Sequence, residues 1–405
     1  MRCKLSDICS YRKGKTEVKR LNNITYISTE NMLPNKGGIT EASSLPSIVL
    51  TQEYRKGDVL VSNIRPYFKK IWQAKYDGGC SNDVLVFTPN PMTDKDFLYY
   101  VLANDEFFLY SMATSKGTKM PRGDKGSIMQ YEIPDIGLDR QRKIASVLKS
   151  LDGKIQLNIA INNNLEQQAS LLFKSWFVDF EPFDELFVNT PTGVKAPSSL
   201  KMEQISNIPH TLETGRRPKG GAVSEGIPSI GAENVKELGK VNFSSTKYIP
   251  EDFAAKMKTG AVNGYELMLY KDGGKPGTFI PHFSMFGEGF PYETFFINEH
   301  VFKLDFYDHG FNEFVYFYMQ TDYPYHWLAN NGGKAAVPGI NQQDVNSIWI
   351  FTPDNPKVKE FCEWVQPLFT TIFTNCTQNV KLAKLRDSLL PNLLSGKIDV
   401  STLDL

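Results

Sequence analysis

The most constraining feature of this sequence is a helix-forming stretch that occurs twice, 217 positions apart. Apolar or amide side chains recur there at alternating steps of four and three residues, the spacing of a helix stripe that packs against a partner helix. The first stripe comprises Ile144, Leu148, Leu151, Ile155, Asn158, Asn162, Leu165, Ala169, Leu172 and Trp176. The second comprises Phe361, Val365, Leu368, Ile372, Asn375, Asn379, Leu382, Arg386, Leu389 and Leu393. We therefore predict two long, related helices.

The same two positions of each stripe carry asparagine: Asn158 and Asn162 in the first copy, Asn375 and Asn379 in the second. If the helices of a duplicated chain meet about a pseudo-twofold axis, they run antiparallel. The simplest symmetric register then places Asn158 opposite Asn379, and Asn162 opposite Asn375. A buried amide is costly without a partner and so fixes one register. The pattern predicts an antiparallel coiled coil aligned by two asparagine pairs.

The repeat extends beyond the helices. The offset of 217 also relates Pro121 to Pro338, and it shrinks to 208 where residues 57–60 match 265–268 and to 203 where Ile27 matches Ile230. The halves therefore differ by loop insertions, and a repeat this long indicates two copies of one globular domain. We predict an α+β protein with two tandem α/β globular domains, each followed by a long helix. The expected boundaries are domain 1 at 1–137, the first helix at 138–181, a linker at 182–200, domain 2 at 201–354, the second helix at 355–396 and a tail at 397–405.

Local signals predict the helix ends. Asp139 is the expected N-cap of the first long helix, and Asn355 that of the second. Pro367 predicts a kink in the second helix or a start after it. Gly153 lies inside the first helix, where it weakens the helix by about 1 kcal/mol. Residues 97–110 are expected to form one short amphipathic helix.

Composition limits the function classes. The formal net charge of the 405 residues is zero, so any surface for nucleic acid must come from local clusters of positive charge. The five cysteines have no CxxC spacing and are expected to be reduced thiols of a cytoplasmic protein. The polar N-terminus has no signal-peptide core, and no apolar run approaches the 18 residues of a membrane span.

The residue patterns of common catalytic sites are missing. The five histidines are scattered, and none shows the i, i+4 spacing around a glutamate that is typical of zinc hydrolases. No phosphate-binding Gly-x4-Gly-Lys-Ser/Thr loop occurs. An enzyme is therefore disfavoured, and no metal or cofactor site is expected in this chain.

Glycine-rich loops carry cationic, amide and aromatic residues, which are suited to contacts with phosphates and base edges. The candidate DNA-binding residues in the first half are Arg12, Lys13, Lys15, Arg65, Tyr67, Lys69, Lys116, Lys119 and Arg122. Those in the second half are Arg216, Arg217, Lys219, Lys271, Lys275, Asn331 and Lys334. The match of Pro121 to Pro338 predicts that the loops 116–122 and 332–341 occupy one structural address.

Several motifs make the chain resemble the specificity subunit of type I restriction-modification enzymes over essentially its whole length. They are LLFKSWFVDF at 171–180, LRDSLLPNLLSG at 385–396, GDVL at 57–60 and Ile133-Pro134. The second half departs from the third motif, with YELM at 265–268, so the turn that enters this strand is expected to differ.

The resemblance implies a non-catalytic subunit that recognises double-stranded DNA. Each globular domain would recognise one half of a split, asymmetric target, and the helix pair would hold the halves a fixed distance apart. Two methyltransferase subunits would dock on it and carry S-adenosylmethionine. Restriction motor-nuclease subunits, which use Mg and ATP, would join them. A two-domain protein-interaction scaffold without sequence-specific DNA binding is the alternative.

Overall fold

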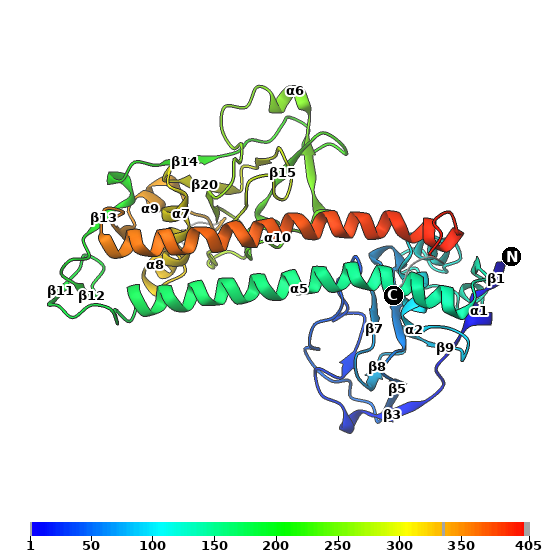
Figure 1. Cartoon of the computed structure of the whole chain (residues 1–405). Coiled ribbons are helices and arrows are strands. Elements are labelled where there is room, and N and C mark those ends of the chain that lie inside the picture. The colour runs from blue at the N-terminus through cyan, green and yellow to red at the C-terminus, as the bar shows by residue number, and fades with distance from the viewer. Residues whose placement is uncertain (1, 334–336, 401–405) are drawn as a thin grey trace. The chain divides into compact units, whose positions relative to one another are not determined.

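The structure is a computed structural model that describes residues 2–333 and 337–400 (Figure 1). The chain divides into two compact units. Unit 1 comprises Met1–Ile155 and Lys381–Leu405, and unit 2 comprises Gln156–Val380. Two long helices, α5 (Leu138–Phe177) and α10 (Pro356–Ser395), each contribute one part to unit 1 and the other to unit 2.

Unit 1 contains two four-stranded sheets, with strand orders β2-β9-β6-β7 and β3-β5-β8-β4, and a separate pair β1-β10. Its strands are β1 (Arg2–Lys4), β2 (Cys9–Tyr11), β3 (Lys15–Glu17), β4 (Tyr26–Ile27), β5 (Leu50–Tyr54), β6 (Val59–Ser62), β7 (Ile71–Gln73), β8 (Gly78–Cys80), β9 (Val84–Pro89) and β10 (Glu132–Pro134). Its helices, besides the first part of α5 and the last part of α10, are α1 (Leu5–Ile8), η1 (Val18–Arg20), η2 (Pro66–Phe68), α2 (Lys95–Ala103), α3 (Asp105–Ala113) and α4 (Lys125–Ile128). The central strand β6 is buried along its whole length, which is why its sequence is continuously apolar before Ser62.

Unit 2 contains a four-stranded sheet of order β14-β20-β17-β18, a three-stranded sheet of order β16-β15-β19, and the pairs β11-β12 and β13-β21. Its strands are β11 (Phe187–Asn189), β12 (Lys195–Pro197), β13 (Met202–Gln204), β14 (Thr211–Thr214), β15 (Ile227–Ile230), β16 (Lys247–Ile249), β17 (Leu267–Tyr270), β18 (Phe283–Met285), β19 (Phe296–Ile297), β20 (Val301–Asp305) and β21 (Trp349–Phe351). Its shorter helices are η3 (Ile205–Asn207), η4 (Ala232–Asn234), η5 (Phe243–Ser245), α6 (Glu251–Ala254), α7 (His309–Tyr318), α8 (Asp322–Gly332) and α9 (Gln342–Asn346).

The duplication is visible in the strand ladders. Unit 1 pairs Val59 with Phe87 on β6 and β9, and unit 2 pairs Leu267 with Leu304 on β17 and β20 at the offsets of 208 and 217. The parallel pair β4-β8 joins Ile27 to Cys80, and its counterpart β15-β19 joins Ile230 to Ile297. The expected α+β fold with two tandem globular domains is therefore confirmed.

The turn before the central strand is kept in both units, so the expected difference at residues 265–268 was wrong. Gly57 has a φ of 97° and Tyr265, at the same position, a φ of 68°. Both donate their N–H to a carbonyl across the sheet, Gly57 to Ala74 at 2.8 Å and Tyr265 to Phe286 at 2.7 Å. A non-glycine residue in this region is strained. Tyr265 is held there by ring contacts with His309 and Phe373.

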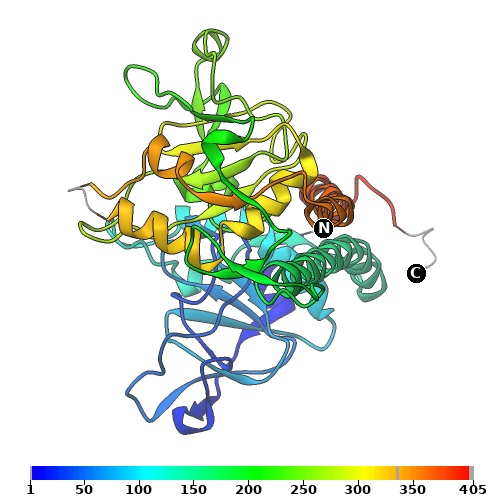
Figure 2. The same cartoon turned by 90° about the vertical axis from the view of Figure 1, so that its left-hand side faces the viewer.

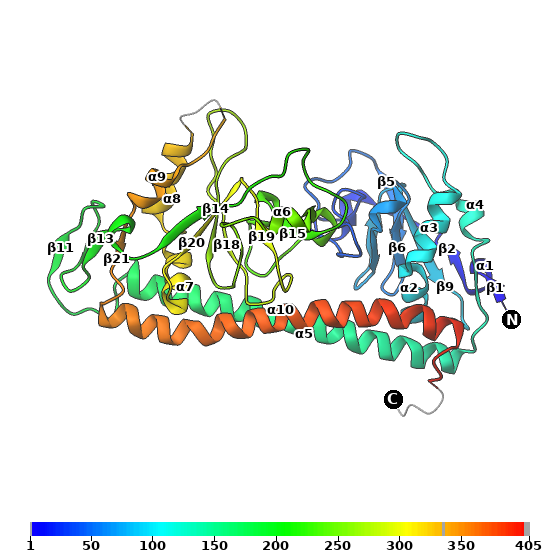
Figure 3. The same ribbon diagram turned by 90° about the horizontal axis from the view of Figure 1, so that it is seen from above.

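The long helices contact each other through their asparagines in unit 2. Asn158 Nδ2 donates to Asn379 Oδ1 at 2.9 Å and to Gln378 Oε1 at 2.7 Å. Asn375 Nδ2 donates to Asn162 Oδ1 at 2.8 Å. Partner numbers fall along α10 as they rise along α5, so the helices run antiparallel here. Figure 2 shows the two helices nearly end-on and next to each other, and Figure 3 shows them lengthwise.

In unit 1 the helices are joined by an ion pair, because Arg386, which interrupts the second stripe, lies opposite Asp152. Arg386 Nη1 lies 2.6 Å from Asp152 Oδ1, and the hydroxyl of Tyr100 donates to Asp152 Oδ2 at 2.7 Å. The stripe also closes the domain cores: Ile144 and Leu148 pack in the core of unit 1, and Phe361 in that of unit 2. A single face of each helix therefore contacts both the other helix and a globular domain.

Two local predictions about helices were wrong, and one of the two alternatives at Pro367, a helix start after it, was wrong as well. Asp139 is not an N-cap, because α5 begins at Leu138 and Asp139 lies in its first turn. Residues 97–110 belong to two helices, since Asn104 ends α2 and caps α3 through Glu106 N. α10 does not start after Pro367 but runs through it. Asn355 does cap α10, accepting a hydrogen bond from Lys357 N at 2.9 Å.

Candidate nucleic-acid interface

Two loops are tied together by their backbones at the end of the central strand of unit 1. One loop follows β6, and the other precedes α4. Arg65 N donates to the carbonyl of Pro121 at 2.8 Å, and Gly123 N donates to that of Asn63 at 3.2 Å. The second loop is closed by two hydrogen bonds between the backbones of Lys116 and Arg122, each 2.9 Å long. These bonds fix residues 63–69 beside residues 116–123.

Unit 2 repeats this arrangement with different residues. Gly273 N donates to the carbonyl of Pro338 at 2.9 Å, and Ile340 N donates to that of Lys271 at 2.8 Å. Lys271 and Gly273 stand 208 positions after Asn63 and Arg65, while Pro338 and Ile340 stand 217 after Pro121 and Gly123. The two loop pairs therefore occupy the same structural address in the two units.

The turn after β6 in unit 1 is unusual. Arg65 (φ 50°) and Lys69 (φ 49°) are both left-handed and bracket the short helix η2. Each costs about 1 kcal/mol for a residue other than glycine. The turn is held by hydrogen bonds from Asn35 N to the carbonyl of Phe68 (2.8 Å) and from Lys36 N to that of Lys69 (2.9 Å). Backbone strain of this kind is concentrated at binding sites.

The first-half candidates in these loops carry positive charge to the surface. Lys69 pairs with Asp105 (2.8 Å), Lys116 with Asp124 (2.7 Å), and Arg122 with Asp83 (3.1 Å). Lys116 holds the pKa of Asp124 well below its usual range. The side chains of Lys116 and Arg122 stay 81% and 55% exposed. Tyr67 and Lys119 are exposed as well, so this group is available to a ligand.

The candidate DNA-binding residues of the second half are less clustered than those of the first half. Lys271 Nζ donates to the carbonyl of Glu299 at 3.0 Å, and Arg217 Nη1 lies 3.8 Å from the carboxylate of Glu299, so these two cations share a neighbour. The side chains of Arg216, Lys219 and Lys275 are exposed, and that of Asn331 is half-buried. Lys334 lies outside the described residues. His300, which was not among the candidates, contacts Asp272, the neighbour of Lys271 in the loop after β17. Its Nδ1 lies 2.5 Å from Asp272 Oδ1.

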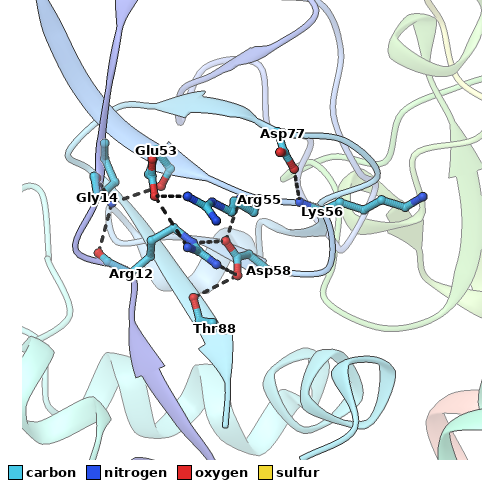
Figure 4. A network of polar contacts seen from close by, with 9 residues as sticks. Arg12, Gly14, Glu53, Arg55, Lys56, Asp58, Asp77 and Thr88 are labelled. Carbon is cyan, nitrogen blue, oxygen red and sulfur yellow. Dashed lines mark hydrogen bonds and ion pairs between the residues drawn. The ribbon is translucent and has the colours of Figure 1, made fainter. Parts of the chain in front are cut away.

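Arg12 is used inside unit 1 rather than at this surface (Figure 4). Its guanidinium makes a two-pronged contact with Asp58, which is 2% exposed, and the Nη2–Oδ1 distance is 2.9 Å. Asp58 also accepts hydrogen bonds from Arg55 N (2.8 Å) and from the hydroxyl of Thr88 (2.9 Å). The hydrogen bond to Asp58 raises the pKa of Arg12. Asp58 precedes β6, whereas the tied loops follow it, so the structure does not bring Arg12 together with Arg65. Lys13 and Lys15, next to Arg12, are exposed.

Unit 2 keeps this buried carboxylate but obtains its cation elsewhere. Glu266, at the position of Asp58, accepts hydrogen bonds from Asn263 N (2.9 Å) and Gly264 N (2.7 Å) and lies 3.5 Å from Lys303 Nζ. Lys303 comes from β20, the strand between β14 and β17, and also pairs with Glu213 on β14 at 2.8 Å. In the ladders Glu213 stands where Arg12 does, since Arg12 N bonds to Val86 and Glu213 pairs with Lys303. Sequence reasoning missed this exchange of charges.

In residues 2–333 and 337–400, no group of three or more histidines, cysteines, aspartates or glutamates is placed to hold a metal ion. Within the same residues, no helix combines the length and apolarity that crossing a membrane requires.

Comparisons with known proteins identify the class to which this fold belongs. The model of the type I restriction modification DNA specificity domain matches residues 1–167. The crystal structure of the S subunit of a type I restriction-modification system from M. genitalium aligns over 97% of this chain and 96% of its own, with a TM-score of 0.56 and 14% identity. The fold is therefore that of an S subunit.

Two relatives extend the comparison to the sequence. The specificity subunit of the type I restriction enzyme HindI from Haemophilus influenzae is 24% identical over 97% of this chain and 98% of its own. That of MjaIX from Methanocaldococcus jannaschii is 28% identical over 76% of this chain and 70% of its own. The chain is therefore similar to type I restriction-modification specificity subunits, which are the non-catalytic, DNA-recognising members of these enzymes.

Proposed function

We propose that this subunit recognises a bipartite, asymmetric DNA target, with one half-site bound by each globular domain. In this proposal residues 1–137 and 201–354 are the target-recognition domains. The helices, at 138–181 and 355–396, set the spacer between the half-sites, and residues 182–200 and 397–405 are linker and tail. The subunit acts in the cytoplasm, where the DNA of a restriction-modification system lies.

The observation that carries the proposal is the repeated loop pair. Both units tie two loops together through the same backbone hydrogen bonds, at Arg65–Pro121 and at Gly273–Pro338. The side chains on these fixed backbones differ between the units. Cations positioned in this way suit phosphate contacts, whereas the differing side chains suit recognition of differing bases. Unlike side chains on like scaffolds support a target whose halves have different sequences.

The proposed assembly with partner subunits rests on the resemblance to type I specificity subunits and agrees with the neutral charge of the chain. Two methyltransferase subunits, which carry S-adenosylmethionine, dock on this subunit, and restriction motor-nuclease subunits complete the enzyme. These partners supply positive surface that a chain of zero formal charge lacks, so the complex binds DNA more tightly than this subunit alone.

Methylome sequencing tests the proposal. Cells that express this chain with a type I methyltransferase subunit from the same source are compared with cells that express the methyltransferase subunit alone. We expect adenine methylation at a split, asymmetric motif that requires this chain. A stable complex that methylates no new motif would contradict DNA recognition and would favour the scaffold alternative.

The half-site assignment has its own test. Replacing Arg65, Lys116 and Arg122 with alanine is expected to relax or abolish recognition of one half-site and to leave the bases of the other unchanged. Lys19→Ala is the matched control, because Lys19 is 78% exposed but lies outside the tied loops. Equal effects on both half-sites would show that the loops of unit 1 do not serve one half-site.

A further inference from the structure

The tip of the tied loops in unit 1 is apolar as well as cationic. Tyr67 and Phe68 are 48% and 38% exposed, and their ring centroids lie 4.6 Å apart. Met120, in the adjoining loop, is also 48% exposed. The hydrogen bond from Arg65 N to the carbonyl of Pro121 lies two residues from Tyr67 and one from Met120, so these side chains project from one fixed piece of backbone.

More cationic side chains than carboxylate partners surround this apolar tip. Lys36 and Lys69 share Asp105, at 2.9 and 2.8 Å, while Arg122 and Lys116 pair with one aspartate each. Arg65 and Lys119 form no ion pair with any residue that the structure describes. Arg65 Nε is, within the same residues, a buried donor without an acceptor. The surroundings of the tip therefore favour a polyanion as its occupant.

Unit 2 lacks exposed rings at the same address. The loop after β17 is four residues longer than the loop after β6, because Gln73 pairs with Val59 in unit 1 whereas Met285, 212 positions later, pairs with Leu267 in unit 2. The phenyl ring of this longer loop, Phe279, is only 3% exposed, and the apolar side chains exposed there are Ile280 (51%) and, at the position of Met120, Val337 (71%). The aromatic tip is therefore a property of unit 1 and not of the repeated fold.

We propose that Tyr67 and Phe68 insert as a wedge between two base pairs of the half-site bound by unit 1, with Met120 beside them. Apolar side chains inserted in this way unstack a base step and bend the duplex, and aromatic rings stack on any base. The short helix η2, locked between two left-handed residues, presents the rings on a rigid support, so little ordering is needed on binding. The half-site bound by unit 2 keeps its stacking. This inference rests on the proposed function and adds a deformation of one half-site to it.

A fluorescence experiment tests the wedge. The full-length chain in complex with its methyltransferase subunits is bound to duplexes in which 2-aminopurine replaces one base at a time across both half-sites. Besides any rise at the adenines that the methyltransferase extrudes, we expect a rise that depends on the two rings at one step of a single half-site, because unstacking relieves quenching. In the variant with Tyr67→Ala and Phe68→Ala that rise is lost and binding weakens roughly ten- to hundredfold. Tyr67→Trp keeps the rise, and so does Met92→Ala, whose exposed side chain lies outside the loops.

Other outcomes overturn the proposal. If every rise survives in the double alanine variant, the signal belongs to another part of the complex, such as base extrusion by the methyltransferase, and the rings unstack no base step. A double variant that loses its methyltransferase subunits would show that the rings contact protein. Specific binding by the wild-type complex without any rise that depends on these rings sinks the wedge alone. Absence of specific binding by the wild-type complex sinks the proposed function together with the wedge.

Discussion

At the scale of single residues, burial decides what a charged side chain can do. Arg12 and Arg65 each lie in a loop that follows a short strand, β2 and β6 respectively, and the sequence alone does not distinguish their roles. Arg12 faces Asp58, which is 2% exposed and would be a costly buried charge without a cation. Arg65 forms no ion pair among the described residues. The first is therefore a structural residue, whereas the second has no counter-charge in the fold and fits the proposed contact with DNA.

Replacing Arg12 with methionine is expected to lower the free energy of unfolding of unit 1 by about 3 kcal/mol, since the carboxylate of Asp58 stays buried without its counter-charge. Denaturant unfolding followed by tryptophan fluorescence measures this change, and adding Asp58→Asn should restore part of it. Lys13→Met, on the exposed neighbour, is the control. A changed methylation motif with unaltered stability would instead make Arg12 a DNA contact.

Glu313 predicts a pH dependence of stability. Its carboxylate is 0% exposed, 2.9 Å from His309 Nδ1, with Asp308, Tyr265 and Cys362 nearby on other turns and elements. Burial raises its pKa from 4.5 to about 7. Between these values the folded protein binds more protons than the unfolded chain, so this stabilising contribution is complete below pH 4.5 and is lost as the pH rises to about 7.

Glu313→Gln, which cannot ionise, isolates that contribution. We expect unfolding measurements to show the variant gaining stability relative to the wild type between pH 5 and pH 8. Glu288→Gln, on an exposed residue, is the control and should follow the wild type at both pH values. A difference between Glu313→Gln and the wild type that is the same at pH 5 and pH 8 would contradict the assignment.

At the scale of elements, the long helices contain residues that fix their register and residues that disfavour a helix. Asn158 is fully buried in the pair with Asn379, and its Oδ1 accepts no hydrogen bond from the described residues. This residue favours one register at some cost in stability. Pro367 and Pro391 lie inside α10, where packing against the cores outweighs their poor helix propensity.

Gly153 is a weak point of α5 that has no packing reason. It is exposed, and a Cβ built on it meets nothing within 4 Å. Gly153→Ala is therefore expected to stabilise the helix by about 1 kcal/mol, as a higher midpoint in denaturant unfolding. Gly193→Ala is the matched opposite, because Gly193 also has open space but a φ of +80°, and it should destabilise. A loss of stability in Gly153→Ala would reveal a need for flexibility at this point.

At the scale of the whole molecule, the proposed spacer function makes helix length a determinant of DNA specificity. Deleting residues 153–156 together with 381–384 removes about one turn, or roughly 6 Å, from each helix. Both deletions lie between the Asp152–Arg386 and Asn158–Asn379 contacts, which are kept. We expect methylome sequencing to show the same half-sites separated by a spacer one or two base pairs shorter.

Replacing the seven of these residues that are not already alanine with alanine keeps the length and serves as the control. This variant should methylate the wild-type motif. A deletion variant that is stable and active on the original spacer would refute the role of the helices in setting the distance.

The sequence by itself determined the repeat, the two long helices and the asparagine register, because the spacing of residues along a helix can be read directly from the order of residues in the chain. It also determined that Pro121 and Pro338 occupy equivalent positions in the two units, since the repeat offset of 217 is constant in this region. The division of the cations was decided only by the tertiary structure. Whether Arg12 meets Asp58, or Lys303 meets Glu266 and Glu213, depends on which strands lie side by side. The same holds for the exposed rings of Tyr67 and Phe68, whose accessibility depends on a strained turn and on hydrogen bonds from distant loops. Such contacts join residues far apart in the chain, and their burial sets whether a charge stabilises the fold or remains free to bind.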